Sequence, residues 1–571
     1  MKKIIVLFFL ININISFSQL PPILLPGYPI VVDSTQGAYD SGASPIVAGF
    51  NNDGENEILI CVNLSLLTGS VYLLDFDGNV KPNFPIEVSC INSYINSAAG
   101  DVDGDGFLDI VVKADSLYVF NYNGNLTNGF PAYFQNSQTS LGDRLAIYDL
   151  DNNGNLEIIL GRAHILSVYN SNGQVRSGWP KYFNIDNLVA FVSFPTIGDL
   201  NFDNIPEIIS PVSYYNYSTL KHDSNKIYIY EPDGSLYLNP EINSDSNYFF
   251  SFNPAVIFKN KQKDSTFFVI NSNNSPTGAP NTFKSRVTIY NSTGGIINRF
   301  NLVPRFVLGQ ISMGDLDGDS IPDIVFGNSF SQVYAYNLKG NLFPGYPVFS
   351  NNYEYRSSSI GKLSENNCIM NMSWLNTTNY LQSYNNQGAQ LTWSPLYPVG
   401  SPLCAVTFCD LNKDKNVDFM VTTFGIKGNG HATGLYAWTM QGINYNSENF
   451  PWPMYGHDRY RTNQLGFIPP DEPVGIHPTS TNVPDKFSLY QNFPNPFNPV
   501  TTIKFDIRTA AFTKLSVFDI LGREIQTLVN EELKTGSYSL VFDGSEYNSG
   551  VYFYRLASGD FTETKRMLMV K

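Results

Sequence analysis

Apolar residues fall in short runs along most of this chain, and turns rich in Gly, Asn and Asp separate the runs. Apolar and polar residues often alternate inside a run, which is typical of β-strands, and almost no stretch has the periodicity of an amphipathic helix. Aromatic-rich strands that end in a polar turn with Gly recur about every 50 residues. The turn glycines are Gly78, Gly124, Gly173, Gly234, Gly294, Gly340, Gly388 and Gly442. The pattern predicts an all-β chain made of repeated units.

A second repeat, an acidic loop, lies about 25 residues before most of these glycines. In its fullest copy, residues 101–109, acidic side chains stand at loop positions 1, 3, 5 and 9. Five copies supply the candidate metal ligands Asp101, Asp103, Asp105, Asp109, Asp149, Asp151, Asn153, Glu157, Asp199, Asn201, Asp203, Glu207, Asp315, Asp317, Asp319, Asp323, Asp410, Asn412, Asp414 and Asp418. A weaker copy spans residues 49–57, and in the two remaining units Lys259 and Lys362 stand near the place of the first acid.

A strand with proline beside an aromatic residue completes many units, so each unit contains about four short strands. About 50 residues cannot bury a core alone, and their repetition predicts a β-propeller at residues 19–466. Eight units predict eight blades, with seven as the alternative if one unit without acids is not a blade. An additional copy of the proline strand at residues 26–32 precedes the first unit. Whether it closes the ring stays open, because the last unit has its own candidate at residues 449–456.

The acidic loops have the chemistry of calcium sites. Alternating oxygen ligands in a tight turn converge on one centre, and Ca²⁺ takes about six to eight oxygens. An EF-hand is excluded because position 12 is an apolar strand residue in four copies, and Ser210 in the fifth, where a bidentate Glu is required. We predict about five structural Ca²⁺ ions that stabilise the strand-to-strand turns, because the repeated loops recruit no distinct catalytic partner.

The two ends of the chain differ from the repeats. Two lysines, an apolar run at residues 4–11 and a polar stretch ending at Ser18 are typical of a secretory signal peptide, with cleavage expected before Gln19. No stretch is long enough to span roughly 30 Å of hydrocarbon as a helix. Residues 467–485 are predicted to be a linker, and residues 486–571 a small β-sandwich. The helix-like spacing near residues 520–533 is interpreted as part of a hairpin, because its flanks are strand-like.

Composition limits the partners. The formal net charge of −15 argues against nucleic-acid or anionic-membrane binding, because phosphate contacts need clustered Lys and Arg. Seventeen of the twenty candidate ligands are acids, so the acidity is largely a metal-binding feature. The five Cys are too few and too irregularly spaced for a disulfide framework, and are predicted to be small buried apolar residues.

The loops and their following strands resemble FG-GAP or VCBS-type repeats, the calcium-bearing blades of integrin α-subunit heads and many bacterial surface proteins. The resemblance covers residues 19–466 and implies metal ligands at loop positions 1, 3, 5 and 9. The chain lacks the Gly-Ala-Pro of that family after the second strand, and it has no inserted ligand-binding domain. Integrin ligands therefore do not carry over.

Residues 486–571 closely resemble the type A sorting domain of the type IX secretion system of Gram-negative bacteria. The blocks that carry the resemblance are QNFPNPFNP from Gln491, ILGREI from Ile520, SGVYFYRL from Ser549 and the basic ending at Lys571. The resemblance implies the type IX machinery as a partner, removal of the domain in many members, and release or attachment to surface lipopolysaccharide. The expected location is secreted or on the outer-membrane surface.

Two functions of the propeller are considered beside a purely structural or unassigned role. The first is a non-catalytic binding or adhesion module for glycans or proteins, because Tyr, Phe and Asn suit stacking on sugars and hydrogen bonding to them. The alternative is a calcium-dependent polysaccharide lyase, because some eight-bladed calcium propellers with comparable loops are such enzymes. A lyase needs a base, and His457, beside Asp458 and two arginines, is the most suggestive of five histidines. We favour His457 as a structural turn residue, and no other catalytic motif is found.

Overall fold

The computed structural model describes residues 20–33, 44–90, 95–134, 144–183, 188–274, 284–302, 310–349, 358–424, 433–469 and 477–570, apart from short stretches within these ranges. The predicted signal peptide lies outside them. In this part of the chain the single helical element is the short 3-10 turn η2 (Ser447–Asn449). No described helix is long and apolar enough to cross a membrane.

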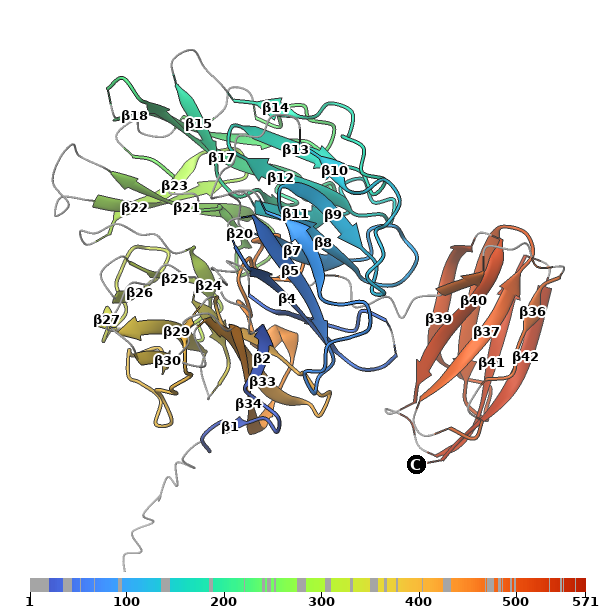
Figure 1. Cartoon of the computed structure of the whole chain (residues 1–571). Helices are drawn as coiled ribbons and strands as arrows, with labels where there is room; N and C mark the ends of the chain where they lie inside the picture. The colour runs from blue at the N-terminus through green and yellow to red at the C-terminus, as the bar shows by residue number, and fades with distance from the viewer. Residues whose placement is uncertain are drawn as a thin grey trace, which may run out of the picture.

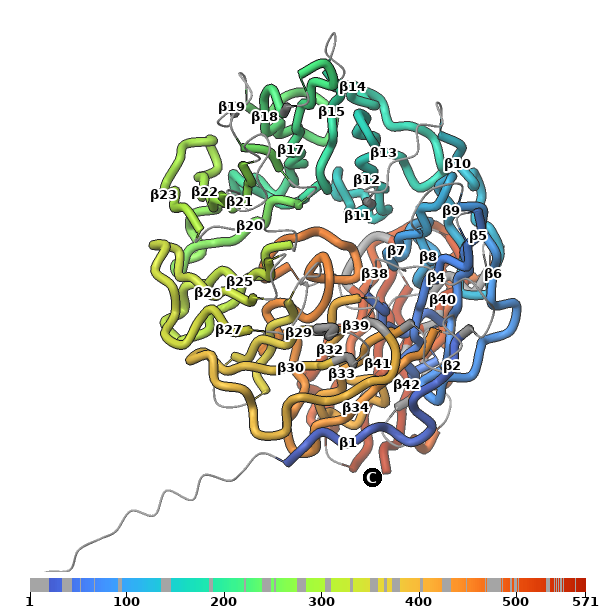
Figure 2. Tube along the Cα trace, turned by 60° about the vertical axis from the view of Figure 1, so that its left-hand side comes forward, coloured from blue at the N-terminus to red at the C-terminus, as the bar shows by residue number. Residues whose placement is uncertain are grey.

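The described residues between Ile23 and Asn444 form eight antiparallel sheets that are arranged around a ring (Figures 1 and 2). We number them sheets 1 to 8 in chain order. Sheet 1 consists of β3 (Ile46–Ala48), β4 (Glu57–Asn63), β5 (Thr68–Leu74) and β6 (Ile86–Ser89). Sheet 2 consists of β7 (Asn96–Gly100), β8 (Asp109–Lys113), β9 (Ser116–Phe120) and β10 (Ala132–Tyr133). Sheet 3 consists of β11 (Arg144–Tyr148), β12 (Glu157–Arg162), β13 (Ile165–Tyr169) and β14 (Lys181–Tyr182).

Sheet 4 consists of β15 (Val189–Val192), β16 (Thr196–Gly198), β17 (Glu207–Asn216), β18 (Lys221–Tyr230) and β19 (Ile242–Asn243). Sheet 5 consists of β20 (Val256–Lys259), β21 (Thr266–Asn274), β22 (Lys284–Asn291) and β23 (Ile296–Asn301). Sheet 6 consists of β24 (Ser312–Gly314), β25 (Asp323–Gly327), β26 (Gln332–Tyr336) and β27 (Val348–Phe349). Sheet 7 consists of β28 (Ser359–Gly361), β29 (Cys368–Leu375) and β30 (Thr378–Tyr384). Sheet 8 contains β31 (Ser401–Pro402), β32 (Thr407–Cys409), β33 (Asn416–Phe424) and β34 (Thr433–Asn444). The prediction of an all-β propeller is confirmed.

The core lies between neighbouring sheets. The second strands of sheets 1, 2 and 6 are buried at every position, because each sheet has another sheet on both faces. Leu59 and Val71 of sheet 1, for example, belong to one apolar cluster with Ile110 and Val112 of sheet 2. The five cysteines are free thiols and buried, as predicted.

Strands from the N-terminal end complete the last sheet. β1 (Ile23–Leu24) and β2 (Ile30–Asp33) both pair antiparallel with β34, with Ile23 opposite Thr439 and Ile30 opposite Leu435. The proline strand at residues 26–32 therefore closes the ring, which settles the question that the sequence left open. The rival candidate, residues 449–456, takes a different path.

That path runs through the middle of the ring. Residues 449–467, which we call the central segment, turn inward after β34 and occupy the centre (orange in Figure 2). Six strand N–H groups donate hydrogen bonds of 2.8–3.1 Å to its carbonyl groups, those of Ala99, Ile147, Ile197, Ile257, Ile360 and Phe408, and the N–H of Lys362 donates a seventh at 2.8 Å. The six belong to the first strands of six sheets, and each of these strands pairs within its sheet on one side only. In sheets 4 and 8 the first strand is interrupted, and β16 and β32 are its second parts. The central segment thus satisfies strand edges that would otherwise face an open channel.

Glycines at the inner ends of the sheets make room for the central segment. A Cβ atom on Gly361 would lie 2.2 Å from the Phe450 ring, and one on Gly314 would lie 2.7 Å from Pro451. Similar approaches to the central segment occur at Gly100 and Gly198. A larger side chain at the last position of these first strands would therefore displace the central segment.

The C-terminal unit is a sandwich of two four-stranded sheets (orange-red in Figure 1). One contains β35 (His477–Ser480), β40 (Gly536–Asp543), β37 (Val500–Ile507) and β36 (Ser488–Leu489); the other contains β39 (Glu524–Leu533), β38 (Ala511–Phe518), β41 (Gly550–Ser558) and β42 (Phe561–Met569). β38 and β39 form the hairpin predicted for the helix-like segment. Two parts of the predicted linker are structured, since Phe467 packs on Tyr148 and Tyr460, and β35 pairs with β40.

We expect Gly361→Ala to lower the free energy of unfolding by about 2 kcal/mol, because the new methyl group meets Phe450 in a closely packed interior. Thermal or denaturant unfolding measures this. Ser218→Ala, in an exposed turn, is the control and should change stability by less than about 0.5 kcal/mol. Phe450→Ala combined with Gly361→Ala should cost less than the sum of the two single changes, and strict additivity would contradict the contact.

Candidate functional site

The five acidic loops occupy equivalent places in their sheets. Each connects the first strand to the second strand, in sheets 2, 3, 4, 6 and 8. The loops that hold the twenty predicted ligands are residues 101–109, 149–157, 199–207, 315–323 and 410–418.

The ninth loop position has one register throughout the ring. In all eight sheets it lies opposite the last residue of the first strand, as Asp109 lies opposite Gly100. It is acidic in six sheets, and Thr266 and Cys368 take its place in sheets 5 and 7. The six acids are Glu57, Asp109, Glu157, Glu207, Asp323 and Asp418. All eight side chains are at most 3% exposed, so six carboxylates are buried at one level of the ring.

The loop backbone holds one oxygen of each buried carboxylate. The N–H of loop position 2 donates to it at 2.7–2.9 Å in all six sheets, as Val102 does to Asp109 Oδ2. The first acid organises the rest of the loop: Asp101 Oδ1 accepts from Gly104 N and Asp101 Oδ2 accepts from Gly106 N. The loops are therefore shaped by their own carboxylates, and this shape leaves the second oxygen of the ninth residue facing inward.

That second oxygen meets different surroundings in different sheets. In sheets 4 and 8, Glu207 Oε1 and Asp418 Oδ1 are buried without a hydrogen-bond partner, as is Asp410 Oδ1. In sheet 1, Lys81 Nζ lies 2.8 Å from Glu57 Oε1. In sheet 3, Arg176 lies 3.1 Å from Glu157 Oε1 and 2.9 Å from Asp151 Oδ2. In some sheets a cationic side chain from another turn thus contacts the acidic loop, and in others a buried carboxylate oxygen of the loop stays unpaired.

Burial raises the pKa values of these carboxyl groups, and neighbouring carboxylates add to the effect. The pKa rises to about 8 at Asp109, Asp323 and Glu207, and to about 6 at Asp418. At Glu157 burial raises the pKa to about 7, although Arg176 acts in the opposite direction. A buried carboxylate without a positive partner is costly to ionise, so these sites favour a bound cation.

Three loops bring acids close enough to share one ion. The grouped side chains, whose ligand oxygens lie within 4.8 Å of one another, are Asp101, Asp103 and Asp109; Asp149, Asp151 and Glu157; and Asp315, Asp317 and Asp323. In the other two loops the amide at position 3 bonds the acid at position 5, with Asn201 Nδ2 3.0 Å from Asp203 Oδ2 and Asn412 Nδ2 3.2 Å from Asp414 Oδ2. Oxygen-only donor sets with orphaned buried oxygens fit a hard divalent cation such as Ca²⁺.

Sequence reasoning missed the two cationic side chains. Lys81 and Arg176 are each the third residue after a turn glycine, Gly78 and Gly173, so their shared position is visible in the repeat. In sheets 2, 4, 6 and 8 this position holds the neutral residues Thr127, Tyr237, Phe343 and Tyr445. Lys362, which the sequence suggested as an ion substitute, has an exposed side chain, and its N–H donates to Asn449 O.

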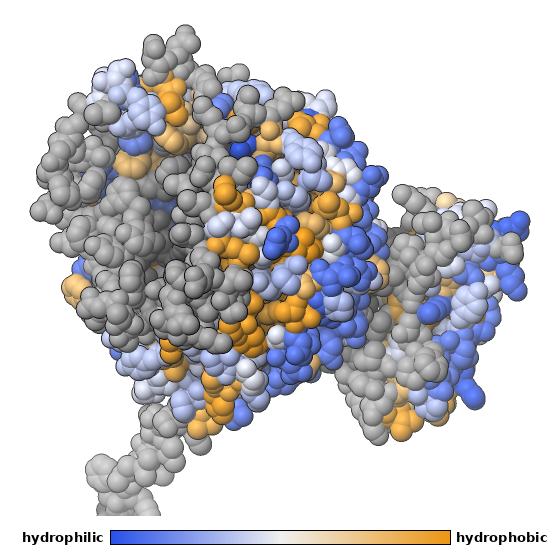
Figure 3. Space-filling view, viewed as in Figure 1, coloured by the Kyte–Doolittle hydropathy of each residue, from blue (hydrophilic) through white to orange (hydrophobic). Residues whose placement is uncertain are grey.

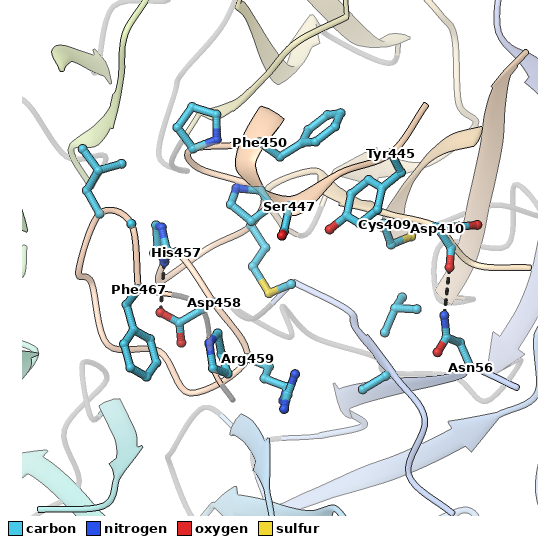
Figure 4. A pocket seen from close by; sticks show the side chains of 18 of the residues that line it. Asn56, Cys409, Asp410, Tyr445, Ser447, Phe450, His457, Asp458, Arg459 and Phe467 are labelled. Carbon is cyan, nitrogen blue, oxygen red and sulfur yellow. Dashed lines mark hydrogen bonds and ion pairs between the residues drawn. The ribbon is translucent and has the colours of Figure 1, made fainter. Parts of the chain in front are cut away.

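A cavity of about 810 Å³ opens beside the central segment, which supplies much of its lining, and Asp410 and Lys413 line it from the acidic loop of sheet 8 (Figure 4). Asn56 Nδ2 donates to Asp410 O at 2.8 Å on one side of it. On the other side His457 Nδ1 lies 3.0 Å from Asp458 Oδ2, and the His457 ring meets Trp452 edge-on. His457 is 5% exposed in a turn of the central segment, so its contacts are those of a packed structural residue.

Comparison with protein families supports both resemblances. Residues 40–112 match the FG-GAP-like repeat, and residues 491–571 match the secretion system C-terminal sorting domain. The second match indicates a type IX cargo that interacts with the secretion machinery and is secreted or held at the outer-membrane surface. The comparison with curated proteins finds no match.

Several solved structures align with much of the chain at low identity. The crystal structure of BBS1N in complex with ARL6DN, soaked with lead, is 12% identical over 75% of this chain and 99% of that chain, with a TM-score of 0.37. The WD40 domain of SCAP from fission yeast is 11% identical over 74% of this chain and 98% of that chain, with a TM-score of 0.36. Quinohemoprotein alcohol dehydrogenase from Comamonas testosteroni is 9% identical over 64% of this chain and 80% of that chain, with a TM-score of 0.30.

Lys81→Met should lower the free energy of unfolding by about 2 kcal/mol, because it leaves the buried Glu57 carboxylate without its cation. Denaturant unfolding measures the change. The control is Lys514→Met, which breaks an exposed ion pair with Glu524 and should cost less than about 0.5 kcal/mol. Adding Glu57→Gln to Lys81→Met should recover part of the loss. A Lys81→Met protein as stable as the parent would contradict this role.

Proposed function

We propose that the chain is an exported, calcium-stabilised β-propeller that acts as a non-catalytic binding or adhesion module for extracellular glycans or proteins. The observation that carries the proposal is the central segment, which fills the middle of the ring. A ligand therefore meets the outer surfaces, the loop faces or the cavity beside the central segment. The face seen in Figure 3 carries hydrophilic and hydrophobic residues side by side, as protein surfaces ordinarily do, so a ligand site is sought in its grooves.

The proposed calcium ligands are the acids and amides at positions 1, 3, 5 and 9 of the five loops. Calcium would supply positive charge at the inward oxygen of the ninth residue and relieve repulsion among the other carboxylates. The orphaned oxygens of Glu207, Asp410 and Asp418 support this assignment in sheets 4 and 8. The grouped acids support it in sheets 2 and 6.

Sheet 3 is the exception among the five. Its acids are also grouped, but Arg176 already contacts Asp151 and Glu157, so an ion there competes with a guanidinium. We therefore propose four calcium sites without a competing side chain and one weakened site at residues 149–157. The weak acidic copy in sheet 1 needs no ion, because Lys81 occupies the corresponding place.

The delivery route follows from the C-terminal unit. We propose signal-peptide cleavage near Ser18, a propeller at residues 19–466, a connection at 467–485 and a sorting domain at 486–571. The sorting domain would be recognised by the type IX machinery, and the cargo would then be released or attached to surface lipopolysaccharide. The match over residues 491–571 supports this route.

The alternative function, a calcium-dependent polysaccharide lyase, receives less support. It requires an accessible base beside the sugar and a cation facing its carboxylate. His457 is buried and contacts Asp458 and Trp452, which suits a fold-stabilising role. A rise in absorbance at 235 nm with any acidic polysaccharide would favour the lyase over the binding module.

Removal of calcium tests the metal proposal. Excess EGTA should lower the melting temperature of the mature chain by about 10 °C, because several filled sites each contribute roughly 2–3 kcal/mol. Differential scanning calorimetry with and without restored Ca²⁺ measures the shift. Mg²⁺ at the same concentration is the control and should restore less, because it demands a stricter octahedral geometry. An unchanged melting temperature in EGTA would sink the calcium assignment.

Arg176→Gln should add about one calcium ion to the tight-binding stoichiometry, because it removes the cation that competes at residues 149–157. Isothermal titration calorimetry on the mature chain counts the ions. The variant should also be less stable than the parent in EGTA and regain stability in calcium. The matched control is Arg523→Gln in the sandwich, where an exposed Arg523–Asp519 pair is lost. An unaltered stoichiometry would overturn the proposed competition.

A further inference from the structure

Exposed aromatic side chains recur on the outermost strands of the ring. Two residues after the strand proline stand Tyr133, Tyr182, Phe349 and Tyr397, and all four are more than 60% exposed. Single exposed rings are common on protein surfaces, but rings that recur at one position of a repeat become informative where two of them share one surface.

Two of these rings share one groove. Tyr133 of sheet 2 and Tyr182 of sheet 3 line a concave space of about 380 Å³ between the outer strands of the two sheets. The floor of the groove comes from β12 and β13, including Ser167 and Tyr169, and Trp179 lines one wall. Its size is in the range of small-ligand sites, and its mixture of rings and a few polar groups is typical of them.

The groove is basic although the chain carries a net charge of −15. Its described lining contains Arg162 and Arg176 and no Asp or Glu. Arg162 is positioned by Phe134, with its guanidinium carbon 4.5 Å from the ring centroid, and Arg176 is held from behind by Asp151 and Glu157. Because Asp151 and Glu157 offset the charge of Arg176, Arg162 is the main source of positive potential in the groove, and it favours an anionic ligand.

We propose that this groove binds an anionic oligosaccharide, with sugar rings stacked on Tyr133 and Tyr182 and a sugar carboxylate contacted by Arg162. Two rings from neighbouring sheets on one groove offer two stacking places along a polymer. A planar guanidinium pairs with a carboxylate through two parallel hydrogen bonds. The inference rests on the proposed glycan-binding function and gives it a site and a ligand class.

Binding to oligogalacturonate and to its methyl ester tests the site, because esterification removes the negative charge of the carboxylate and adds only a methyl group. We expect the mature full chain, in calcium, to bind the free acid more tightly than the ester by isothermal titration calorimetry. Tyr133→Ala with Tyr182→Ala should weaken binding of the free acid at least about tenfold. The matched control, Phe349→Ala with Tyr397→Ala, removes two rings that are equally exposed elsewhere and should leave binding unchanged. All four positions are exposed, so the variants should fold.

Arg162→Gln separates charge recognition from stacking. This change should weaken binding of the free acid about tenfold and leave binding of the ester unchanged, because only the acid offers a carboxylate. Equal losses for both probes would overturn the role of Arg162. Binding that survives the Tyr133 and Tyr182 changes would overturn the groove and leave the proposed binding function standing. Failure to bind any carbohydrate, including sulfated polymers, would overturn both the groove and the glycan half of the proposed function.

Discussion

A buried carboxylate at the start of the second strand is the constraint on which the loops of this ring depend. One oxygen holds the loop through the N–H of position 2, and the other points inward and needs positive charge. Ionising such a group without a partner is costly in a medium of low polarity. The loop geometry, the acidic composition and the two internal cations Lys81 and Arg176 are consequences of meeting this one requirement.

The central segment imposes the second constraint. The first strand of each sheet leaves one edge unpaired, and a ring of eight sheets would leave these edges around an open channel. The central segment fills the channel and accepts hydrogen bonds from six of the strands, and glycines such as Gly361 let it approach. The middle of the ring is thereby used for stability. A ligand site on the ring would then lie farther out, as the proposed groove lined by Tyr133 and Tyr182 does.

Local patterns in the sequence predicted the repeated strands, the placement of all five acidic loops and the β38–β39 hairpin. They could not decide how the ring closes, because the residues 26–32 and 449–456 carry the same proline-aromatic pattern. Only the pairing of Ile30 with Leu435 and the path of the central segment distinguish them. Arg176 was missed because its contact with Glu157 joins two turns of one sheet, about twenty residues apart, and this depends on register. Lys362 was favoured instead because it replaces the acid in linear sequence.

Because the ninth loop position has one register in all eight sheets, the residue there and its charged neighbours can be compared from sheet to sheet. Sheets 1 and 3 place Lys81 and Arg176 against a buried Glu, and sheets 5 and 7 replace the acid with Thr266 and Cys368. Sheets 2, 4, 6 and 8 keep the acid and have a neutral residue where the cation would stand. The sheets with the strongest proposed ion sites therefore alternate with sheets that carry a cationic side chain or no acid at the ninth position. Because neighbouring sheets bury their faces against each other, each sheet proposed to depend on an ion is flanked by two that depend on it less or not at all.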